Sequence, residues 1–186
     1  LHLAAIIYPF ENDSFVQDNY ASLNQVVRNS VDPNDKIETH GGTIPYSAVQ
    51  NRDYLYYTIR FQNTGNSYAT RIVITDTLTE NVDASTFEFL SSSVPFVMNV
   101  VDRKHFTWTA ANTYLPDSIA DEANSHGYIS FRIKPSAGLL PSDEITNRAS
   151  IVFDYNAAIL TNTCTTNIIE QRILSVKNNE IKSIHL

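Results

Sequence analysis

The sequence predicts an all-β protein whose main part is an antiparallel β-sandwich of about 7–9 strands. Three observations support this: short segments in which apolar and polar side chains alternate, polar turns between them, and no convincing long helical pattern. The segment 54–62 alternates best, because the odd-numbered residues from Leu55 to Phe61 are aliphatic or aromatic and share one face. We expect that face to lie in the core.

The first 30 residues predict two strands, at 3–8 and 21–28, joined by a polar loop. A lone two-stranded hairpin is marginal in water, so residues 1–30 are expected to end a preceding β-domain or to pair with the main one. The turn formers at 29–35 give the best domain boundary. We therefore divide the chain into 1–30, a main domain at 31–169, and a C-terminal piece at 170–186.

The main domain contains nine candidate strands, separated by turns that contain Pro, Asp or Ser. They are residues 36–39, 53–63, 70–77, 86–91, 97–101, 105–109, 127–133, 144–155 and 159–168. A helical turn or two is expected only at 117–123. Residues 170–180 are polar and predict a linker, and residues 181–186 resemble the start of another strand.

The composition excludes several classes of protein. A hydrophobic fraction of 42% supports a real core, while five glycines and seven prolines argue against disorder. A net charge of −7 disfavours nucleic acid and anionic membranes as partners, and no apolar run approaches the roughly 20 residues of a membrane helix. The lone cysteine, Cys164, cannot form an intrachain disulfide and is interpreted as a passive thiol.

Seven sequence motifs carry a resemblance to a known family. They are DPNDK at 32–36, YTIRFQNTG at 57–65, ITDTL at 74–78, LPDS at 115–118, SHGY at 125–128, NRASIVFDYN at 147–156 and TNT at 161–163. In this order and spacing they resemble the conserved immunoglobulin-like domain of unknown function carried by type IX-secreted surface proteins of Bacteroidetes. The resemblance covers residues 32–168 and departs from the family at Ala157 and Ala158, where a proline before the isoleucine is more usual.

The resemblance implies an immunoglobulin-like sandwich in an exported, surface-attached protein. Such a domain usually precedes a C-terminal sorting domain, and residues 184–186 look like its lead-in strand without the family's signature motif. The expected partners are upstream domains of the same polypeptide and, through the missing C-terminal domain, the secretion machinery. The expected function is a non-catalytic structural or interaction module that spaces or presents an upstream domain.

The alternative function is a carbohydrate-binding accessory module of a secreted hydrolase. In that case exposed tyrosines, at Tyr54, Tyr56, Tyr114 or Tyr155, would stack on the sugar rings of a glycan. Three coplanar exposed aromatic rings would favour this function, and scattered tyrosines would favour the structural module. Trp108 shares a face with Phe106 and is interpreted as a core residue rather than a sugar platform.

Two special sites are conceivable near the start of the main domain. The oxygens of Asp32, Asn34 and Asp35 could bind calcium, with Asp154 or Asn156 completing the shell, although an Asx-turn explains the same cluster without metal. An intramolecular isopeptide bond, known in other surface sandwiches, needs a first-strand lysine, a last-strand asparagine and a buried acid. Lys36, Asn162 and Asp76 have suitable positions, and ordinary hydrogen bonding is the simpler interpretation.

Two further residues are interpreted as structural. Asn147 lies on the predicted inner face of its strand, so its amide is expected to bond the backbone of a neighbouring strand. Asp154 shares the opposite face with Arg148 and is expected near basic side chains.

No catalytic constellation is predicted. The five histidines have no metal-ligand spacing to one another or to Cys164. Asp117-Ser118 and Ser125-His126 contain the residue types of a hydrolase triad, but no nucleophile elbow or oxyanion glycine accompanies them. We therefore expect a protein that is not an enzyme.

Overall fold

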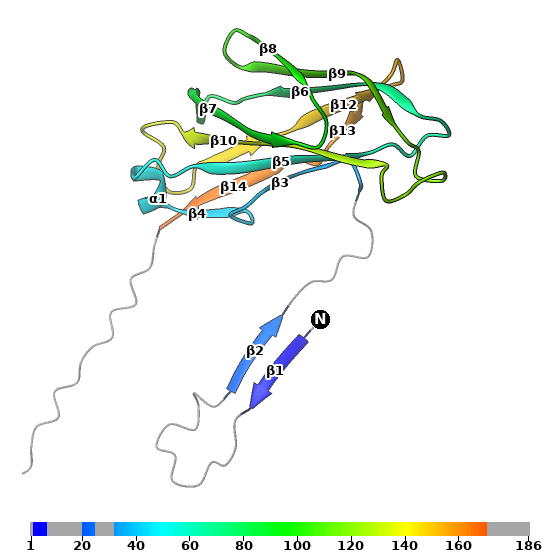
Figure 1. Ribbon diagram of the computed structural model, residues 1–186. Helices are drawn as coiled ribbons and strands as arrows, with labels where there is room; N and C mark the ends of the chain where they lie inside the picture. Colours follow the sequence, from blue (N-terminus) through cyan, green and yellow to red (C-terminus); the bar gives the residue numbers. More distant parts are fainter. Residues whose placement is uncertain (1, 7–19, 25–31, 171–186) are drawn as a thin grey trace, which may run out of the picture. The chain divides into compact units, whose positions relative to one another are not determined.

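The computed structural model describes residues 2–6, 20–24 and 32–170 (Figure 1). Contacts along the chain divide it into two units, Leu1–Asp32 and Pro33–Leu186. In the first unit, strands β1 (His2–Ile6) and β2 (Tyr20–Asn24) form the predicted antiparallel hairpin. The expected linker and lead-in strand at 171–186 lie outside the described residues.

The second unit is a β-sandwich, as predicted. Its elements are β3 (Asp35–Glu38), β4 (Thr43–Pro45), α1 (Tyr46–Gln50), β5 (Leu55–Gln62), β6 (Ala69–Thr77), β7 (Val82–Ser92), β8 (Val97–Val101), β9 (His105–Leu115), β10 (His126–Pro135), β11 (Glu144–Asn147), β12 (Ala149–Phe153), β13 (Ile159–Leu160) and β14 (Cys164–Ile169).

Three sheets form two layers. One sheet has the strand order β3-β5-β10-β7, and a second, facing it, has the order β13-β12-β6-β9-β8 (Figure 1). The third, β11-β14-β4, continues the first layer because β14 lies beside β3. All pairs are antiparallel except β14 with β4, which are parallel.

The strand segments of residues 32–170 outnumber the prediction because β4 was not predicted and because two long strands each change partners. The chain pairs with β14 up to Asn147, and from Ala149 onward it pairs with β6 and β13 in the opposite layer. The predicted strand at 144–155 therefore becomes β11 and β12, and that at 159–168 becomes β13 and β14. Such a switch is a tertiary event that leaves the local alternation unchanged.

The predicted register of β5 is confirmed. Leu55, Tyr57, Ile59 and Phe61 are all fully buried, whereas Tyr56 and Arg60 face outward. Trp108 is 1% exposed and belongs to the core, as expected from the face that it shares with Phe106. The aromatic centre also includes Phe131, whose ring stacks on Trp108 with centroids 5.9 Å apart.

The helical prediction was right only for a single turn, in which the Asp121 N–H donates to the Asp117 carbonyl at 3.0 Å, and no helix continues from it. Residues 117–123 form turns, in which Asp117 Oδ1 accepts hydrogen bonds from the backbone N–H groups of Ile119 and Ala120. The helix α1 lies instead at Tyr46–Gln50, directly after β4. Five residues are too few to show a helical period, so neither α1 nor the three-residue strand β4 had a detectable signal.

The first and last strands of the sandwich run side by side in the same direction. Near the start of both, Lys36 bonds with Asn162 and Cys164, and farther along both, Glu38 bonds with Thr166. The chain therefore enters the sandwich at one end, through β3, and leaves it at the opposite end, through β14 (Figure 1).

Candidate functional site

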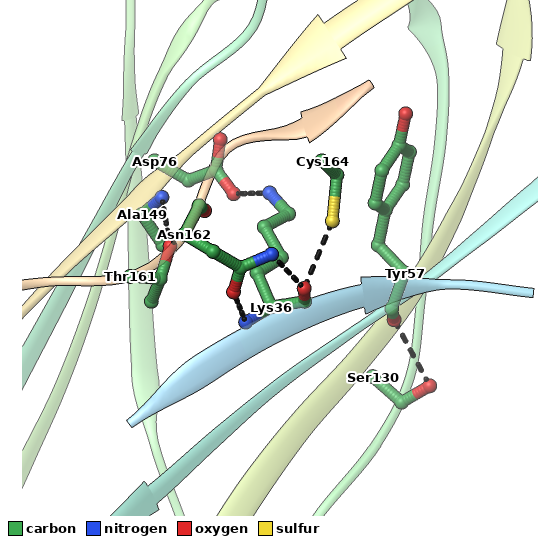
Figure 2. A network of polar contacts seen from close by, with 8 residues as sticks. All are labelled: Lys36, Tyr57, Asp76, Ser130, Ala149, Thr161, Asn162 and Cys164. Carbon is green, nitrogen blue, oxygen red and sulfur yellow. Dashed lines mark hydrogen bonds and ion pairs between the residues drawn. The ribbon is translucent and has the colours of Figure 1, made fainter. Parts of the chain in front are cut away.

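A charged pair lies in the middle of the core. Lys36 on β3 is fully buried, and its side chain crosses between the two layers to the carboxylate of Asp76 on β6 (Figure 2). The Lys36 Nζ donates a short hydrogen bond to Asp76 Oδ2. Both side chains have no exposed surface, so the pair is sealed from solvent. Charges in such a place carry a large desolvation cost and need a specific reason.

Aromatic rings line one side of this pair. The Lys36 Nζ lies 4.8 Å from the centroid of the Tyr57 ring and 5.1 Å from that of Phe131. These rings provide a weak electrostatic attraction and exclude water. The Tyr57 hydroxyl has no hydrogen-bond partner within the described residues, so it does not solvate the ammonium group.

The backbone of Lys36 is clamped by the end of the chain. Asn162 Oδ1 accepts from the Lys36 N–H at 2.9 Å, and Asn162 Nδ2 donates to the Lys36 carbonyl at 2.9 Å (Figure 2). The Cys164 Sγ also donates to that carbonyl, at 2.9 Å. From the sequence, Asn162 was considered as the partner of the Lys36 side chain. Its carboxamide instead bonds the Lys36 backbone.

Asn147 differs from expectation in one respect. It is buried on the inner face, but within residues 32–170 neither its Oδ1 nor its Nδ2 has a hydrogen-bond partner. Asp76 Oδ1 is likewise without a partner there. Asn147 pairs with Cys164 across the β11–β14 ladder, and Cys164 Sγ donates to the Lys36 carbonyl, so Asn147 lies in the same layer as Lys36. Its carboxamide acts on the pKa of the Asp76 carboxyl, which places the two side chains beside each other. The two unsatisfied side chains therefore lie together.

Burial shifts both ionisable groups toward their neutral forms. It lowers the pKa of the Lys36 amine, against the opposing attraction of Asp76. It raises the pKa of the Asp76 carboxyl, against the opposing effects of Lys36 and of the nearby Asn147 carboxamide. Both shifts therefore act toward transfer of the shared proton from the amine to the carboxylate.

Cys164 is held as a thiol. Burial raises its pKa to about 11, although Lys36 acts in the opposite direction. A protonated, buried thiol is a poor nucleophile, which agrees with the passive role inferred from the sequence.

The residues considered for calcium bind protein groups. The Asp35 carboxylate receives the guanidinium of Arg60, with a distance of 2.7 Å from Nε to Oδ1, and Asn34 Oδ1 accepts from the Gln62 N–H at 3.2 Å. Asp32 is exposed. In the described part of the chain, no three or more His, Cys, Asp or Glu side chains gather in a way that could hold a metal ion. A calcium ion at this turn stays a prediction.

Asp154 stabilises a different turn. Its Oδ1 accepts three hydrogen bonds of 2.9 Å, from the N–H and Oγ1 of Thr70 and from the N–H of Arg71. The Arg71 guanidinium donates to the Asp154 carbonyl, while Arg148 donates to the Thr161 carbonyl instead. The basic neighbour of Asp154 is therefore Arg71.

The Asp, Ser and His side chains that resemble the parts of a hydrolase triad each bond to other groups of the protein. Asp117 caps its own turn, Ser125 Oγ donates to the Glu122 carbonyl, and His126 Nε2 contacts Glu122 Oε1 at 2.9 Å. These contacts tie the loop before β10 together. They give no nucleophile–base–acid arrangement.

The comparisons with known proteins agree with this fold. The family model described as "Domain of unknown function (DUF7619)" matches residues 32–167, and the chain belongs to this family. No curated protein matches the chain. The full-length major pilin SpaD from Corynebacterium diphtheriae matches with a TM-score of 0.52 and 18% identity, over 72% of this chain and 35% of the pilin.

Two further solved structures are similar at lower scores. The major pilin subunit BcpA of Bacillus cereus has a TM-score of 0.49 and 15% identity, over 90% of this chain and 48% of that one. A collagen-binding domain from a Staphylococcus aureus adhesin has a TM-score of 0.45 and 11% identity, over 74% and 99%. The immunoglobulin-like fold class is confirmed. Within the described residues, no helix is long and apolar enough to cross a membrane.

Proposed function

We propose that this chain belongs to an exported cell-surface protein, in which the sandwich spaces or presents a neighbouring domain. The observation that carries the proposal is the path of the chain, which enters at one end of the sandwich and leaves at the other. A domain inserted in this way separates the upstream and downstream parts of a polypeptide by its full length. Its immunoglobulin-like fold, shared with the SpaD pilin, supports the same use.

The strand arrangement also suits a module under tension. Pulling the chain apart at Pro33 and Glu170 moves β3 and β14 in opposite directions along their common axis. The contacts between them are then loaded together rather than one after another, so they resist as a group. Cross-layer links such as Lys36 to Asp76 add to this resistance.

The carbohydrate-binding alternative finds no platform in the described part of the chain. The rings of Tyr54 and Tyr56 are tilted by 60°, and Arg132 lies over Tyr54 with 4.2 Å between its guanidinium carbon and the ring centroid. Tyr114 lies on β9, in the other layer, and Tyr155 comes after β12. Scattered tyrosines favour the structural module, as argued from the sequence.

Export and sorting by a type IX system rest on the sequence resemblance. The test is to fractionate cells that express the full-length protein, with and without the residues beyond Leu186. We expect surface or medium localisation that depends on those residues. Retention in the cytoplasm with the tail intact would overturn this part of the proposal.

The spacing role has a separate test. An epitope tag placed before Leu1 in the full-length protein reports, through antibody binding to intact cells, whether the upstream part is presented. We expect deletion of residues 33–169 to reduce antibody binding, and replacement by an unrelated sandwich with ends on opposite sides to restore it. A replacement whose ends lie on the same side is the matched control. Equal binding in all four proteins would contradict a spacing role.

A further inference from the structure

We propose that Lys36 and Asn147 form an intramolecular isopeptide bond across the core, assisted by Asp76. The bond would join β3 to β11 and close a covalent loop between the first strand of the sandwich and a strand near its end. This bond would form once in each molecule and would consume no external substrate. It is therefore compatible with the expectation that the protein is not an enzyme. The inference does not depend on the surface location proposed above.

The argument begins with polar atoms that ordinary hydrogen bonding leaves unexplained. Within residues 32–170, Asn147 Oδ1, Asn147 Nδ2 and Asp76 Oδ1 are all buried without a partner. Orphaned buried groups of this kind are rare in native proteins, because each one loses its hydrogen bonds to water without a replacement. Here Asp76 holds the Lys36 amine, the Asn147 carboxamide acts on the same carboxyl, and Asn147 pairs with Cys164, which bonds the Lys36 backbone.

The second step is the chemical state of the three groups. An amine attacks a carbonyl carbon only when it is neutral, and an amide carbonyl becomes electrophilic when an acid donates a hydrogen bond to its oxygen. Burial acts on both groups in the direction that the reaction needs, because it lowers the pKa of Lys36 and raises that of Asp76. When Asp76 carries the proton, it is a donor for Asn147 Oδ1, which otherwise has none in residues 32–170.

The third step is exclusion of water. Lys36, Asp76 and Asn147 are each at most 4% exposed. Tyr57 and Phe131 cover the amine. In such a pocket the amine has no competing water, and its fixed position replaces a bimolecular encounter with an intramolecular one.

The reaction balances without any added reagent. The Lys36 Nζ lone pair attacks Asn147 Cγ and forms an Nζ–Cγ bond. Asp76 accepts a proton from Nζ and delivers a proton to Nδ2, the Cγ–Nδ2 bond breaks, and one ammonia leaves. Asp76 returns to its starting protonation state, and no atom is oxidised or reduced.

Asn162, the partner considered from the sequence, is placed differently. Its carboxamide bonds the backbone N–H and carbonyl of Lys36, each at 2.9 Å, and faces away from the amine (Figure 2). Its role is to hold the backbone of Lys36, so that the side chain extends toward Asp76. The two asparagines thus have separate tasks, one in positioning and one as the acyl donor.

Mass spectrometry of the 186-residue chain tests the bond directly. We expect the denatured protein to be lighter than its sequence by the mass of one ammonia. Because trypsin does not cut after an acylated lysine or before a proline, it should release residues 29–52 joined to residues 133–148. A bond to Asn162 would instead join 29–52 to 149–172. Unmodified mass in protein that melts cooperatively would overturn the proposal.

Variants separate the roles of the residues. Lys36→Met and Asn147→Leu keep approximate size and should show the full sequence mass, as should Asp76→Asn, which lacks an acid. Asn167→Ala, on β14, removes a carboxamide that bonds the Gly42 carbonyl; it is the matched control and should still lose one ammonia in its folded fraction. Each variant is checked for a β-sheet spectrum and a cooperative melt before its mass is read. Ammonia loss that persists in folded Asn147→Leu would assign the bond elsewhere and refute the inference, even if Lys36→Met fails to fold.

Discussion

Replacing Gly127 with alanine should destabilise the sandwich, although glycine is usually a weak residue in a strand. Gly127 is buried on β10 and pairs directly with Phe61 on β5. The Phe61 ring lies across the glycine, so an added Cβ would overlap its Cε2 and Cζ atoms and would lie 2.7 Å from Ser93 Oγ. The ring has little room to move, because it contacts Phe96 and Phe153 with centroids 6.3 and 6.2 Å away.

Two effects of opposite sign decide the outcome. Removing glycine flexibility from the unfolded chain favours folding by roughly 0.4–1 kcal/mol where the backbone permits alanine. Overpacking a fully packed core costs about 1–3 kcal/mol. Since the overlap involves a buried ring rather than a flexible chain end, we expect a net loss of free energy of unfolding. In a domain of this size each kcal/mol lowers the melting temperature by roughly 2–4 °C.

The assay is urea unfolding of the wild type, Gly127→Ala, Phe61→Leu and the double variant. Phe61→Leu alone leaves a cavity, but the smaller side chain makes room for the alanine methyl. We therefore expect the double variant to be more stable than the sum of the two single losses, with a coupling of about 0.5–3 kcal/mol. An unchanged or raised midpoint for Gly127→Ala, or strict additivity, would refute the packing argument.

Three other predictions rest on burial and contacts. Ile59 is fully buried, so Ile59→Ala should lower the free energy of unfolding in urea by about 2–5 kcal/mol. The control Ile119→Ala, at an 84% exposed position, should change it by less than about 0.5 kcal/mol, and similar losses in both variants would mean that the core is misplaced. Because burial raises the pKa of Cys164 to about 11, this thiol should resist iodoacetamide in the native protein at about pH 8 and should react in denaturant. The mass of the labelled protein measures the reaction, and fast labelling of the native protein would show an accessible thiolate. Arg60 already holds the Asp35 carboxylate, so the melting temperature should be equal in calcium and in chelator. A higher melting temperature in calcium alone would support a metal ion at the Asp32–Asp35 turn.

Local pattern was sufficient for much of the fold. The alternation at Leu55 to Phe61 predicted both the strand and its buried face, because side-chain direction in a strand is set by backbone geometry alone. The same reasoning placed Asn147 on an inner face and Trp108 in the core. It could not find α1 or β4, since elements of five and three residues carry no readable period.

The site depended on the tertiary structure. From the sequence, Lys36 and Asp76 were plausible partners, and Asn162 was as good a third residue as any asparagine near the chain end. The structure separates the two asparagines, because Asn147 pairs with Cys164 beside Lys36 and its carboxamide acts on the Asp76 carboxyl. Asn162 was drawn instead to the backbone of Lys36. Which side chains meet in a core depends on strand pairing between segments far apart in the chain, and that pairing leaves no trace in the local sequence period.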